Sequence, residues 1–214
     1  QRAIDAVCVR KRKWVDGKLV FKSRLCIRGF LDPQKHCLPT RSSTASRLSQ
    51  RLLLSISALC EFDVESWDVG TAFLKGFNFG KLVEALRKRG VAMPDRAVFL
   101  NPPANVWRHF RDMPTCKLKI PHDQVGLWLL KLLKAMYDLN DAPLAWQLCL
   151  FEFLIDDLCA HQSLFDECFF FWFSSHDGSV EAVATAHVDD NALGAKPWWL
   201  SDAYSAFVDR FDKV

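Results

Sequence analysis

The sequence predicts an α+β fold in which helices cover one face of a sheet. From residue 61 onward, aromatic and apolar segments with strand character alternate with longer segments of helical periodicity. Near the start of the chain, Asp16-Gly17 separates two strand-like segments and is a strong signal for a two-residue hairpin turn. Half of the 214 residues are hydrophobic, which is enough to build a sizeable core.

The first predicted element is a hairpin made of "VCVRKRKWV" and "KLVFKSRLCIRGF". Its second strand alternates apolar residues with basic ones: Leu19, Phe21, Leu25 and Ile27 against Lys22, Arg24 and Arg28. Because successive side chains of a strand point to opposite faces, one face is expected to be apolar and the other basic. A solvated outer face accounts for the basic row as well as a phosphate-facing role does, so both interpretations stay open.

A helix is predicted next, over "STASRLSQRLLLSISALCEF". The apolar residues expected on its core face recur at i, i+4, i+8 and i+11: Leu48, Leu52, Ile56 and Leu59. Ser43 or Thr44 is expected to cap its start. The following segment, "EFDVESWDVGTAFLKG", is typical of a strand that ends near Asp68.

The middle of the chain, residues 77–125, is the least regular, and only a short helix closed by Gly90 is predicted there. A second long helix is predicted over "LAWQLCLFEFLIDDL", with Trp146 and three leucines marking its turns. Two strands follow, "SLFDECFFFWF" and "VEAVATAHV", separated by the turn "SSHDGS". The last predicted element is a helix over "LSDAYSAFVDRF", capped by Ser201.

Charge is distributed unevenly along the chain, although the formal net charge is only +3. Residues 1–60 contain 13 Lys and Arg against 3 Asp and Glu, whereas residues 140–214 contain 3 against 13. A basic beginning indicates contact with a polyanion, and an acidic end indicates cations or a solvated surface. Together they fit a protein that holds phosphates at one end and metal at the other.

Membrane insertion and secretion are not expected. The beginning of the chain has no apolar core of a signal peptide, and the most apolar runs are too short to span a bilayer. The eight cysteines include no C-x-x-C pair, which favours free thiols in a reducing intracellular compartment. A zinc-binding interaction module built on His109, Cys116 and His122 is a weak alternative, because the ligand spacing is not that of a zinc site.

Three aspartates are the candidate catalytic and metal-binding residues. Asp68 follows the strand "VESW", and the adjacent Asp189 and Asp190 follow "ATAHV". Two strand ends in one sheet can bring such carboxylates together, and Mg²⁺ prefers oxygen ligands from carboxylates and substrate phosphates. Two ions held in this way support phosphoryl transfer. Taken alone, "VDDN" is also ordinary hairpin-turn chemistry.

Six blocks of the sequence, in order along nearly the whole chain, resemble the reverse transcriptase domain of Ty1/copia-type retrotransposon polyproteins. They are "FKSRLCIRGF", "RLLLSISALCEFDVESWDVGTAFLKG", "VFLNPPANV", "LLKAMYDLNDAPLAW", "SLFDECFFFWF" and "AHVDDNALGA". They are similar to the family's K-A-R-L-V-A-R-G-F, D-V-K-T-A-F-L-N-G, Q-P-P-G-F, Y-G-L-K-Q-A-P-R-A-W, S-D-x-C-L-F and Y-V-D-D segments. Each block is common by itself, but six in this order are specific.

The resemblance implies a polymerase fingers–palm fold, with an antiparallel palm sheet and helices packed on one face. Residues 1–214 would form a partial reverse transcriptase domain without the thumb and RNase H regions. The fingers would lie mainly in residues 1–60 and 77–130, and the palm mainly in 61–76 and 131–214.

The family assigns roles to the matching residues of this chain. Asp68, Asp189 and Asp190 fall on the metal-binding aspartates, which would hold two Mg²⁺ or Mn²⁺ ions. Lys22 and Arg24 match fingers residues that meet the triphosphate of the incoming nucleotide. Phe73 matches an aromatic ring beneath the incoming sugar, where its bulk would favour deoxynucleotides; simple core packing is its rival interpretation.

Departures from the family pattern occur in two of the six blocks. Asp141 replaces a glutamine and Leu144 an arginine in a segment that lies along the nucleotide and template, where an acid is expected to repel phosphate. His187 replaces the tyrosine before the paired aspartates. These changes motivate a second hypothesis, that the chain is a catalytically inactive relic that retains the fold.

The resemblance also implies the partners. They are an RNA or DNA template with its primer, deoxynucleoside triphosphates and the remainder of a larger polyprotein, in the cytoplasm or nucleus. A two-metal nuclease would use the same carboxylates, but it does not explain the "APLAW" and "NPP" blocks.

Overall fold

The computed structural model describes residues 3–114, 124 and 127–211. The chain divides into two compact units, and each is built from two separate segments of the sequence. The fold is mixed α and β, with one sheet in each unit among the described residues, which confirms the α+β class.

Unit 1, Gln1–Thr40 with Phe77–Ala142, is built on the predicted hairpin. Strands β1 (Ile4–Val15) and β2 (Lys18–Ile27) pair antiparallel. Asp16 and Gly17 form the turn with φ of 48° and 71°, and positive φ at both positions is typical of a type I′ turn. The beginning of β1 pairs in parallel with β4 (Val98–Asn101), which pairs with β5 (Leu130–Leu132).

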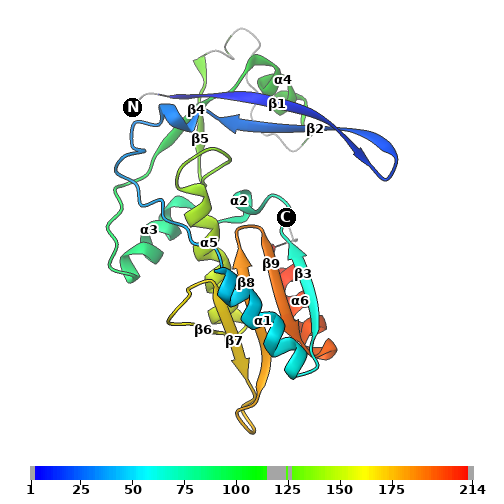
Figure 1. Ribbon diagram of the computed structural model, residues 1–214. Helices are drawn as coiled ribbons and strands as arrows, with labels where there is room; N and C mark the ends of the chain where they lie inside the picture. Colours follow the sequence, from blue (N-terminus) through cyan, green and yellow to red (C-terminus); the bar gives the residue numbers. More distant parts are fainter. Residues whose placement is uncertain (1–2, 115–123, 125–126, 212–214) are drawn as a thin grey trace. The chain divides into compact units, whose positions relative to one another are not determined.

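The apolar face predicted for β2 is buried only where the sheet has more than two strands. Ile27 is 2% exposed, whereas Leu19 and Phe21 are 43% and 68% exposed. The reason is that β1 pairs with β4 only through Ile4 and Asp5, so the rest of the hairpin is a two-stranded ribbon. Figure 1 shows this ribbon, in blue, running on beyond β4.

Short helices complete unit 1. They are η1 (Gly29–Leu31), α3 (Phe79–Lys88) and α4 (Ala104–Asp112). The predicted helix closed by Gly90 is confirmed as α3, and Gly90 has a φ of 73°. At the other end of α3, the Asn78 side chain accepts a hydrogen bond from the Lys81 N–H. This is a normal cap for a helix start.

Unit 2, Arg41–Gly76 with Pro143–Val214, contains an antiparallel sheet in the order β3-β9-β8-β7-β6 among the described residues. The strands are β3 (Asp63–Asp68), β6 (His161–Gln162), β7 (Phe169–Phe173), β8 (Val180–His187) and β9 (Asp190–Ala195).

The helices of unit 2 are α1 (Arg47–Leu59), α2 (Ala72–Lys75), α5 (Ala142–Glu152), the π-helical turn η3 (Phe153–Asp157) and α6 (Pro197–Phe211). Only the first residue of α5 falls in unit 1. No helix within residues 3–114 and 127–211 combines the length and the apolar character that crossing a bilayer requires.

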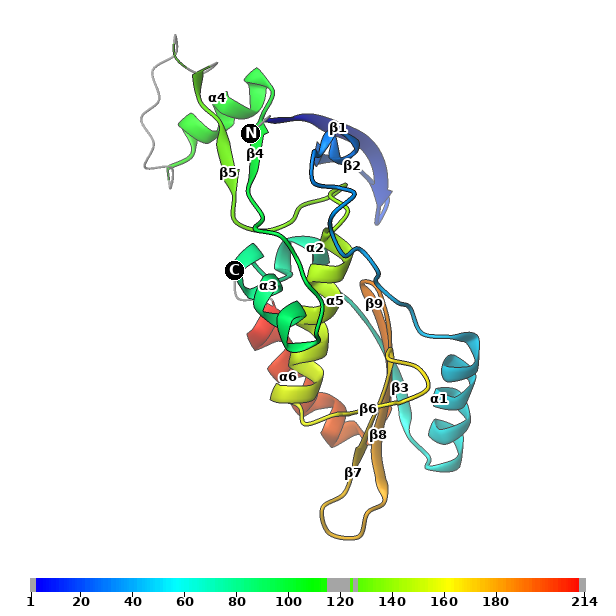
Figure 2. The same cartoon turned by 90° about the vertical axis from the view of Figure 1, so that its left-hand side faces the viewer.

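The prediction that helices pack on one face of the sheet is wrong for unit 2, because both faces are covered (Figure 2). Trp67 of β3 contacts Tyr204 and Phe207 of α6. Gly194 of β9 lies against Ser57 of α1. Its register partner on β3 is Val64, which lies on the face of the sheet opposite to Trp67. Helix α1 therefore covers one face and α6 the other.

Strand composition explains the two-sided cover. In β8, every residue from Ala182 to Ala186 is buried, so side chains on both faces are out of water. A strand buried on both faces is a continuous apolar run rather than an alternating one. The runs "FFFWF" and "AVATA" are continuous in this way and therefore indicate strands that are buried on both faces. The prediction of helices on one face did not use this feature.

Helix α1 packs through a different face from the one predicted. Leu48, Leu52 and Leu59 are 76%, 43% and 84% exposed, and Ile56 is only partly buried. The residue that enters the core is Leu53, which is 1% exposed and contacts a cluster with Phe169 and Val183.

Small residues decide this orientation. Ser49 and Ser57 flank Leu53 on the buried face of α1. A Cβ on Gly194 would lie 2.1 Å from the Ser57 hydroxyl oxygen, so the helix and β9 approach too closely for a larger residue on either side. The cap is Ser46, whose hydroxyl accepts from the Ser49 N–H at 3.1 Å, rather than Ser43 or Thr44.

One further helix boundary differs from the prediction. Helix α6 begins at Pro197, so Ser201 lies inside the helix rather than at its cap; proline is well suited to a first helical position. The division into fingers and palm stays a prediction. Residues 41–60, expected in the fingers segment, belong to unit 2, in which α1 packs on β8 and β9. Residues 131–142, expected in the palm segment, belong to unit 1.

Candidate functional site

The paired aspartates lie at the hairpin turn between β8 and β9. Strand β8 ends at His187 and β9 begins at Asp190, which leaves Val188 and Asp189 as the two central residues. Val188 has a φ of 58° and Asp189 does not have a positive φ. Positive φ at the first central position alone matches a type II′ hairpin turn. The segment is therefore a turn, as its composition alone suggested.

Asp68 lies beside this turn on the neighbouring strand. Asp68 of β3 is the register partner of Asp190 of β9, and the Val69 N–H donates to the Asp189 carbonyl at 3.0 Å. Side chains directly opposite each other in an antiparallel pair have Cβ atoms about 4.5–5.5 Å apart. All three aspartates are exposed. The fold thus brings the three predicted carboxylates to one end of the sheet in unit 2.

The donor set fits a hard divalent cation that is shared with a substrate. Among the described residues, no group of three or more His, Cys, Asp or Glu side chains is placed to hold one ion. Mg²⁺ is usually bound by one or two protein carboxylates, with phosphates and water completing its shell. A site open to solvent with carboxylates on two adjacent strands suits that mode. The binding of two ions stays a prediction.

Val188 holds the turn in a strained conformation. A β-branched residue at positive φ is a backbone outlier that costs on the order of 1–3 kcal/mol. The Trp146 indole N–H donates to the Val188 carbonyl at 2.6 Å. Trp146 is 1% exposed in α5, and its ring contacts Phe211 at 5.2 Å between centroids. The sequence indicated only a structural role for this tryptophan, yet it anchors the turn that carries the aspartates.

Replacing Trp146 by phenylalanine is expected to loosen the turn. The variant loses the bond to Val188 and should lower the free energy of unfolding by roughly 1–2 kcal/mol. Urea denaturation measures the loss, and hydrogen exchange at the Val69 N–H, which bonds the turn, reports the local effect. Trp172→Phe is the matched control, because its indole donates to the Leu158 carbonyl at the same 2.6 Å, away from the turn. Equal exchange at Val69 in the two variants would contradict the anchoring role.

A pocket of about 340 Å³ adjoins Asp190 on the α1 face of the sheet. Its lining comes from α1, β3, β8 and β9: Gln50, Leu53, Leu54, Val64, Ser66, Thr185, His187, Asp190, Asn191 and Ala192. Asn191 is 7% exposed, and its side-chain oxygen accepts no hydrogen bond from the described residues. Sequence reasoning did not single out Asn191, because an Asx residue after two aspartates is typical of a turn.

Phe73, the predicted sugar contact, follows the same strand. It lies in the short helix α2, five residues after Asp68 and within unit 2, and its side chain is half-buried. Thr71 before it has a φ of 58°, so the segment between strand and helix turns sharply. Both the sugar-contact role and the core-packing interpretation of Phe73 stay predictions.

Lys22 and Arg24, the predicted triphosphate contacts, lie on β2 in unit 1, and both are exposed. Lys22 is the register partner of Lys11, so two ammonium groups face each other across the hairpin. The guanidinium of Arg24 lies 5.2 Å from the centroid of the Tyr137 ring, a cation–π contact. The triphosphate role of this basic face stays a prediction.

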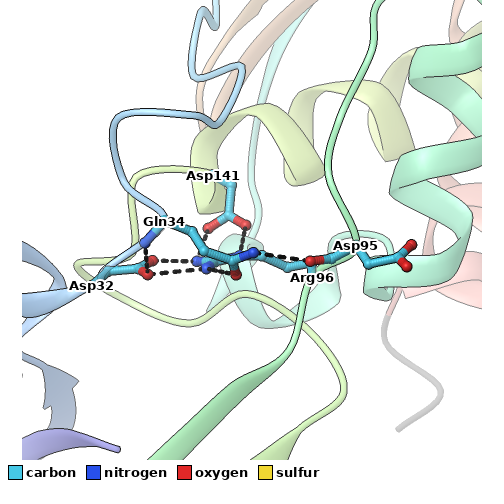
Figure 3. A network of polar contacts seen from close by, with 5 residues as sticks. All are labelled: Asp32, Gln34, Asp95, Arg96 and Asp141. Carbon is cyan, nitrogen blue, oxygen red and sulfur yellow. Dashed lines mark hydrogen bonds and ion pairs between the residues drawn. The ribbon is translucent and has the colours of Figure 1, made fainter. Parts of the chain in front are cut away.

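Asp141 is placed where sequence reasoning did not expect it. It is 0% exposed, and both of its carboxylate oxygens accept hydrogen bonds from Arg96, at 2.8 and 3.3 Å (Figure 3). The same guanidinium donates to both oxygens of Asp32, at 3.1 and 2.5 Å, and to the Gln34 side-chain oxygen at 3.1 Å. All five N–H groups of Arg96 therefore have acceptors.

The buried Arg96 keeps its charge. Burial works to lower the pKa of Arg96, but the hydrogen bonds and charges of Asp32 and Asp141 outweigh burial, and the pKa is raised. One cation thus faces two carboxylates in a site closed to water, because the side chains of Arg96, Asp32 and Asp141 are 0%, 2% and 0% exposed. The Asp141 carboxylate is therefore engaged inside unit 1. Its predicted repulsion of a nucleotide phosphate is not needed to explain why an acid stands there.

Comparison with models of known protein families, and with curated protein sequences, finds no match to this chain. The candidate metal cluster His109, Cys116 and His122 has two members, Cys116 and His122, outside the described residues.

Proposed function

We propose that this chain is a fingers–palm portion of an RNA-directed DNA polymerase of the copia retrotransposon type. The observation that carries the proposal is the register pairing of Asp68 with Asp190, next to Asp189 at the turn. The sequence blocks suggest these three residues independently of the fold. Their meeting at one end of an antiparallel sheet is the arrangement that a polymerase palm requires.

The chain's own residues would act as follows. Asp68, Asp189 and Asp190 would hold the divalent cations, and Trp146 would keep the Asp189 turn in place. Bound cations supply charge neutralisation and activation of the attacking hydroxyl in phosphoryl transfer. In the proposed reaction a primer 3′-hydroxyl attacks the α-phosphorus of a deoxynucleoside triphosphate, and pyrophosphate leaves. The triphosphate contacts of Lys22 and Arg24 are part of the same proposal.

The proposed partners follow from the reaction. They are a template with its primer and deoxynucleoside triphosphates, and the chain would act as part of a larger polyprotein in the cytoplasm or nucleus. Template sequence would not be read through base edges, because a polymerase must accept every sequence. The exposed cations of β2 support contact with a phosphate backbone. Contacts to phosphates position a nucleic acid on the protein without reading its sequence.

A non-catalytic relic is the second candidate. It was motivated by Asp141 and Leu144, which depart from the family pattern. In the structure Asp141 pairs with Arg96, and Leu144 is 6% exposed among core residues. Both substitutions thus have a structural partner or a packing role, and this weakens the reason to regard them as decay of a nucleotide site. A two-metal nuclease stays a less favoured proposal.

The test is primer extension, on an RNA template with an annealed DNA primer, by this chain within a larger polyprotein segment that supplies the thumb region. Deoxynucleotide incorporation should depend on Mg²⁺ or Mn²⁺ and stop with EDTA. Incorporation at background level with both metals would contradict the polymerase proposal and favour the non-catalytic one. Cleavage of the template without incorporation would instead favour a nuclease.

A further inference from the structure

The leucine stripe that sequence periodicity places in the core is exposed to solvent. In α1, Leu48 and Leu59 are 76% and 84% exposed, and Leu52 is 43% exposed. The neighbouring Leu53 is the leucine that enters the core of unit 2. A single exposed leucine needs no explanation, but three along one side of one helix form an apolar surface of the kind that contacts another molecule.

The spacing of the stripe favours a helix as its partner. Leu48, Leu52, Ser55 and Leu59 follow one another at intervals of 4, 3 and 4 residues, and all four are exposed. This is the spacing of the a and d positions of a heptad, which form a narrow seam along one side of a helix. We refer to these four residues as the α1 seam.

The α1 seam is complementary to a second copy of itself in the antiparallel direction. A two-fold axis midway between Leu52 and Ser55 places Leu52 of each copy against Ser55 of the other, and Leu48 against Leu59. Such a contact uses the same surface on both copies. At its centre a large residue meets a small one, which lets the helix axes approach to the usual distance of about 8–10 Å. A parallel pair would set Ser55 against Ser55 and leave a gap.

The charges at the two ends of α1 also favour an antiparallel pair. Arg47 and Arg51 are exposed in its first half, and the exposed Glu61 follows its last residue. In the antiparallel arrangement, Arg47 of each copy comes beside Glu61 of the other. A parallel pair would instead bring each of these groups beside its own equivalent, and like charges repel.

The loop before β7 extends the apolar surface at one end of the seam. Leu164 and Phe165 are 99% and 101% exposed. The next residue, Asp166, accepts hydrogen bonds from the Ser46 N–H and the Ser49 hydroxyl, and these bonds hold the loop beside the start of α1 (Figure 2). Because an antiparallel pair places the start of one helix beside the end of the other, this loop would add apolar contacts near Leu59 of the second copy.

We propose that two copies of this chain associate through the α1 seam as an antiparallel helix pair. Helix α1 has 13 residues and is therefore about 20 Å long, so the contact is small. Small interfaces are typical of weak or transient association, and a dissociation constant in the micromolar range is expected. The inference goes beyond the proposed polymerase function and uses none of the residues assigned to it.

Sedimentation equilibrium of the whole chain across the micromolar range is the experiment. The weight-average mass is expected to rise with concentration and to level off at twice the mass of one chain, because a two-fold contact closes on itself. The mass of a single chain throughout would overturn the proposal, as would a mass that rises past two chains.

Two variants that change the same pair of leucines test the antiparallel register. Leu48→Glu with Leu59→Glu places like charges opposite each other and should abolish measurable association. Leu48→Glu with Leu59→Lys pairs opposite charges in the antiparallel arrangement and like charges in a parallel one. It should associate less tightly than the original chain, but at least about tenfold more tightly than the like-charge variant, since two attractive pairs replace two repulsive ones.

A control removes equally exposed leucines from elsewhere. Leu127→Glu with Leu133→Glu, at positions 82% and 73% exposed in unit 1, should leave the association unchanged. Urea denaturation of each variant checks that the fold is kept, which is expected because the substituted side chains are exposed.

Three further results would overturn the proposal: association that persists in the like-charge variant, a charge-paired variant no stronger than the like-charge one, or an equal loss in the unit 1 control. The assay contains no nucleic acid, nucleotide or divalent cation. Failure of primer extension would therefore leave a positive association result standing, and failure of association would leave the aspartate site to its own test.

Discussion

Substituting Asp189 by asparagine is expected to reduce Mg²⁺-dependent primer extension by two orders of magnitude or more, the scale seen when a group that stabilises transition-state charge is removed. Asparagine has nearly the same shape but no charge, so it cannot neutralise a divalent cation. The fold should survive, because the contact that ties this turn to β3 uses the Asp189 backbone carbonyl and not its side chain. Primer extension and urea denaturation, measured on the same preparation, separate the two effects.

Two further variants, one at a second candidate metal ligand and one at a control position, complete this experiment. Asp68→Asn, on the neighbouring strand, is expected to cause a comparable loss because it faces Asp190. Asp177→Asn is the matched control, since Asp177 is an exposed acid between β7 and β8 whose side chain accepts bonds from Ser179. It should keep full activity. An Asp189→Asn protein that retains a tenth or more of the original extension would contradict the assignment.

Replacing Arg96 by methionine is expected to lower the free energy of unfolding by about 3–5 kcal/mol, the cost of leaving buried charges without their partner. The variant would leave the carboxylates of Asp32 and Asp141 out of water with no cation between them. A shift of the urea midpoint with an unchanged slope would measure this loss.

Matched variants define the role of the network. Arg96→Lys keeps the charge but loses the planar fork that reaches both carboxylates, so an intermediate loss is expected. Arg108→Met, at an exposed arginine of α4, should change stability by no more than about 0.5 kcal/mol. A loss below about 1 kcal/mol for Arg96→Met would show that the network does not hold unit 1 together.

This network also changes what can be learned from restoring the family residues at Asp141 and Leu144. Asp141→Gln would remove a charge that Arg96 binds, and Leu144→Arg would place a cation at a position only 6% exposed. We expect the pair of substitutions to destabilise the protein rather than to increase its activity. Absence of gained activity in that variant would therefore not be evidence that the chain is a relic.

Several features were predictable because they depend on residues close together in the sequence. The Asp16-Gly17 turn, the end of β3 at Asp68 and the turn at Asp189 follow from local propensity and alternation. The contact between Asp68 and the Asp190 strand was an expectation about two strand ends in one sheet, and the register confirms that they are paired.

Other features depend on tertiary packing that no local pattern reports. Leucines occur on several sides of α1, so periodicity alone could not choose between Leu52 and Leu53. The choice rests on close approach to Gly194, more than a hundred residues away. Likewise, Arg96 lies in the segment 77–125, where little secondary structure was predicted, and its two carboxylate partners are 64 and 45 residues distant along the chain.

The way in which the chain divides has a consequence for synthesis. Both units are discontinuous in the sequence, so the first segment of unit 2, Arg41–Gly76, is synthesised before the second segment of unit 1, Phe77–Ala142. Unit 1 can bury Arg96 between its carboxylates only after Asp141 leaves the ribosome. Until then Asp32 and Arg96 lack their third charged partner. Helix α1 likewise cannot pack until the later strands β8 and β9 have been synthesised. Neither unit can be excised as one contiguous fragment, so any truncation that ends before residue 142 leaves both unfinished.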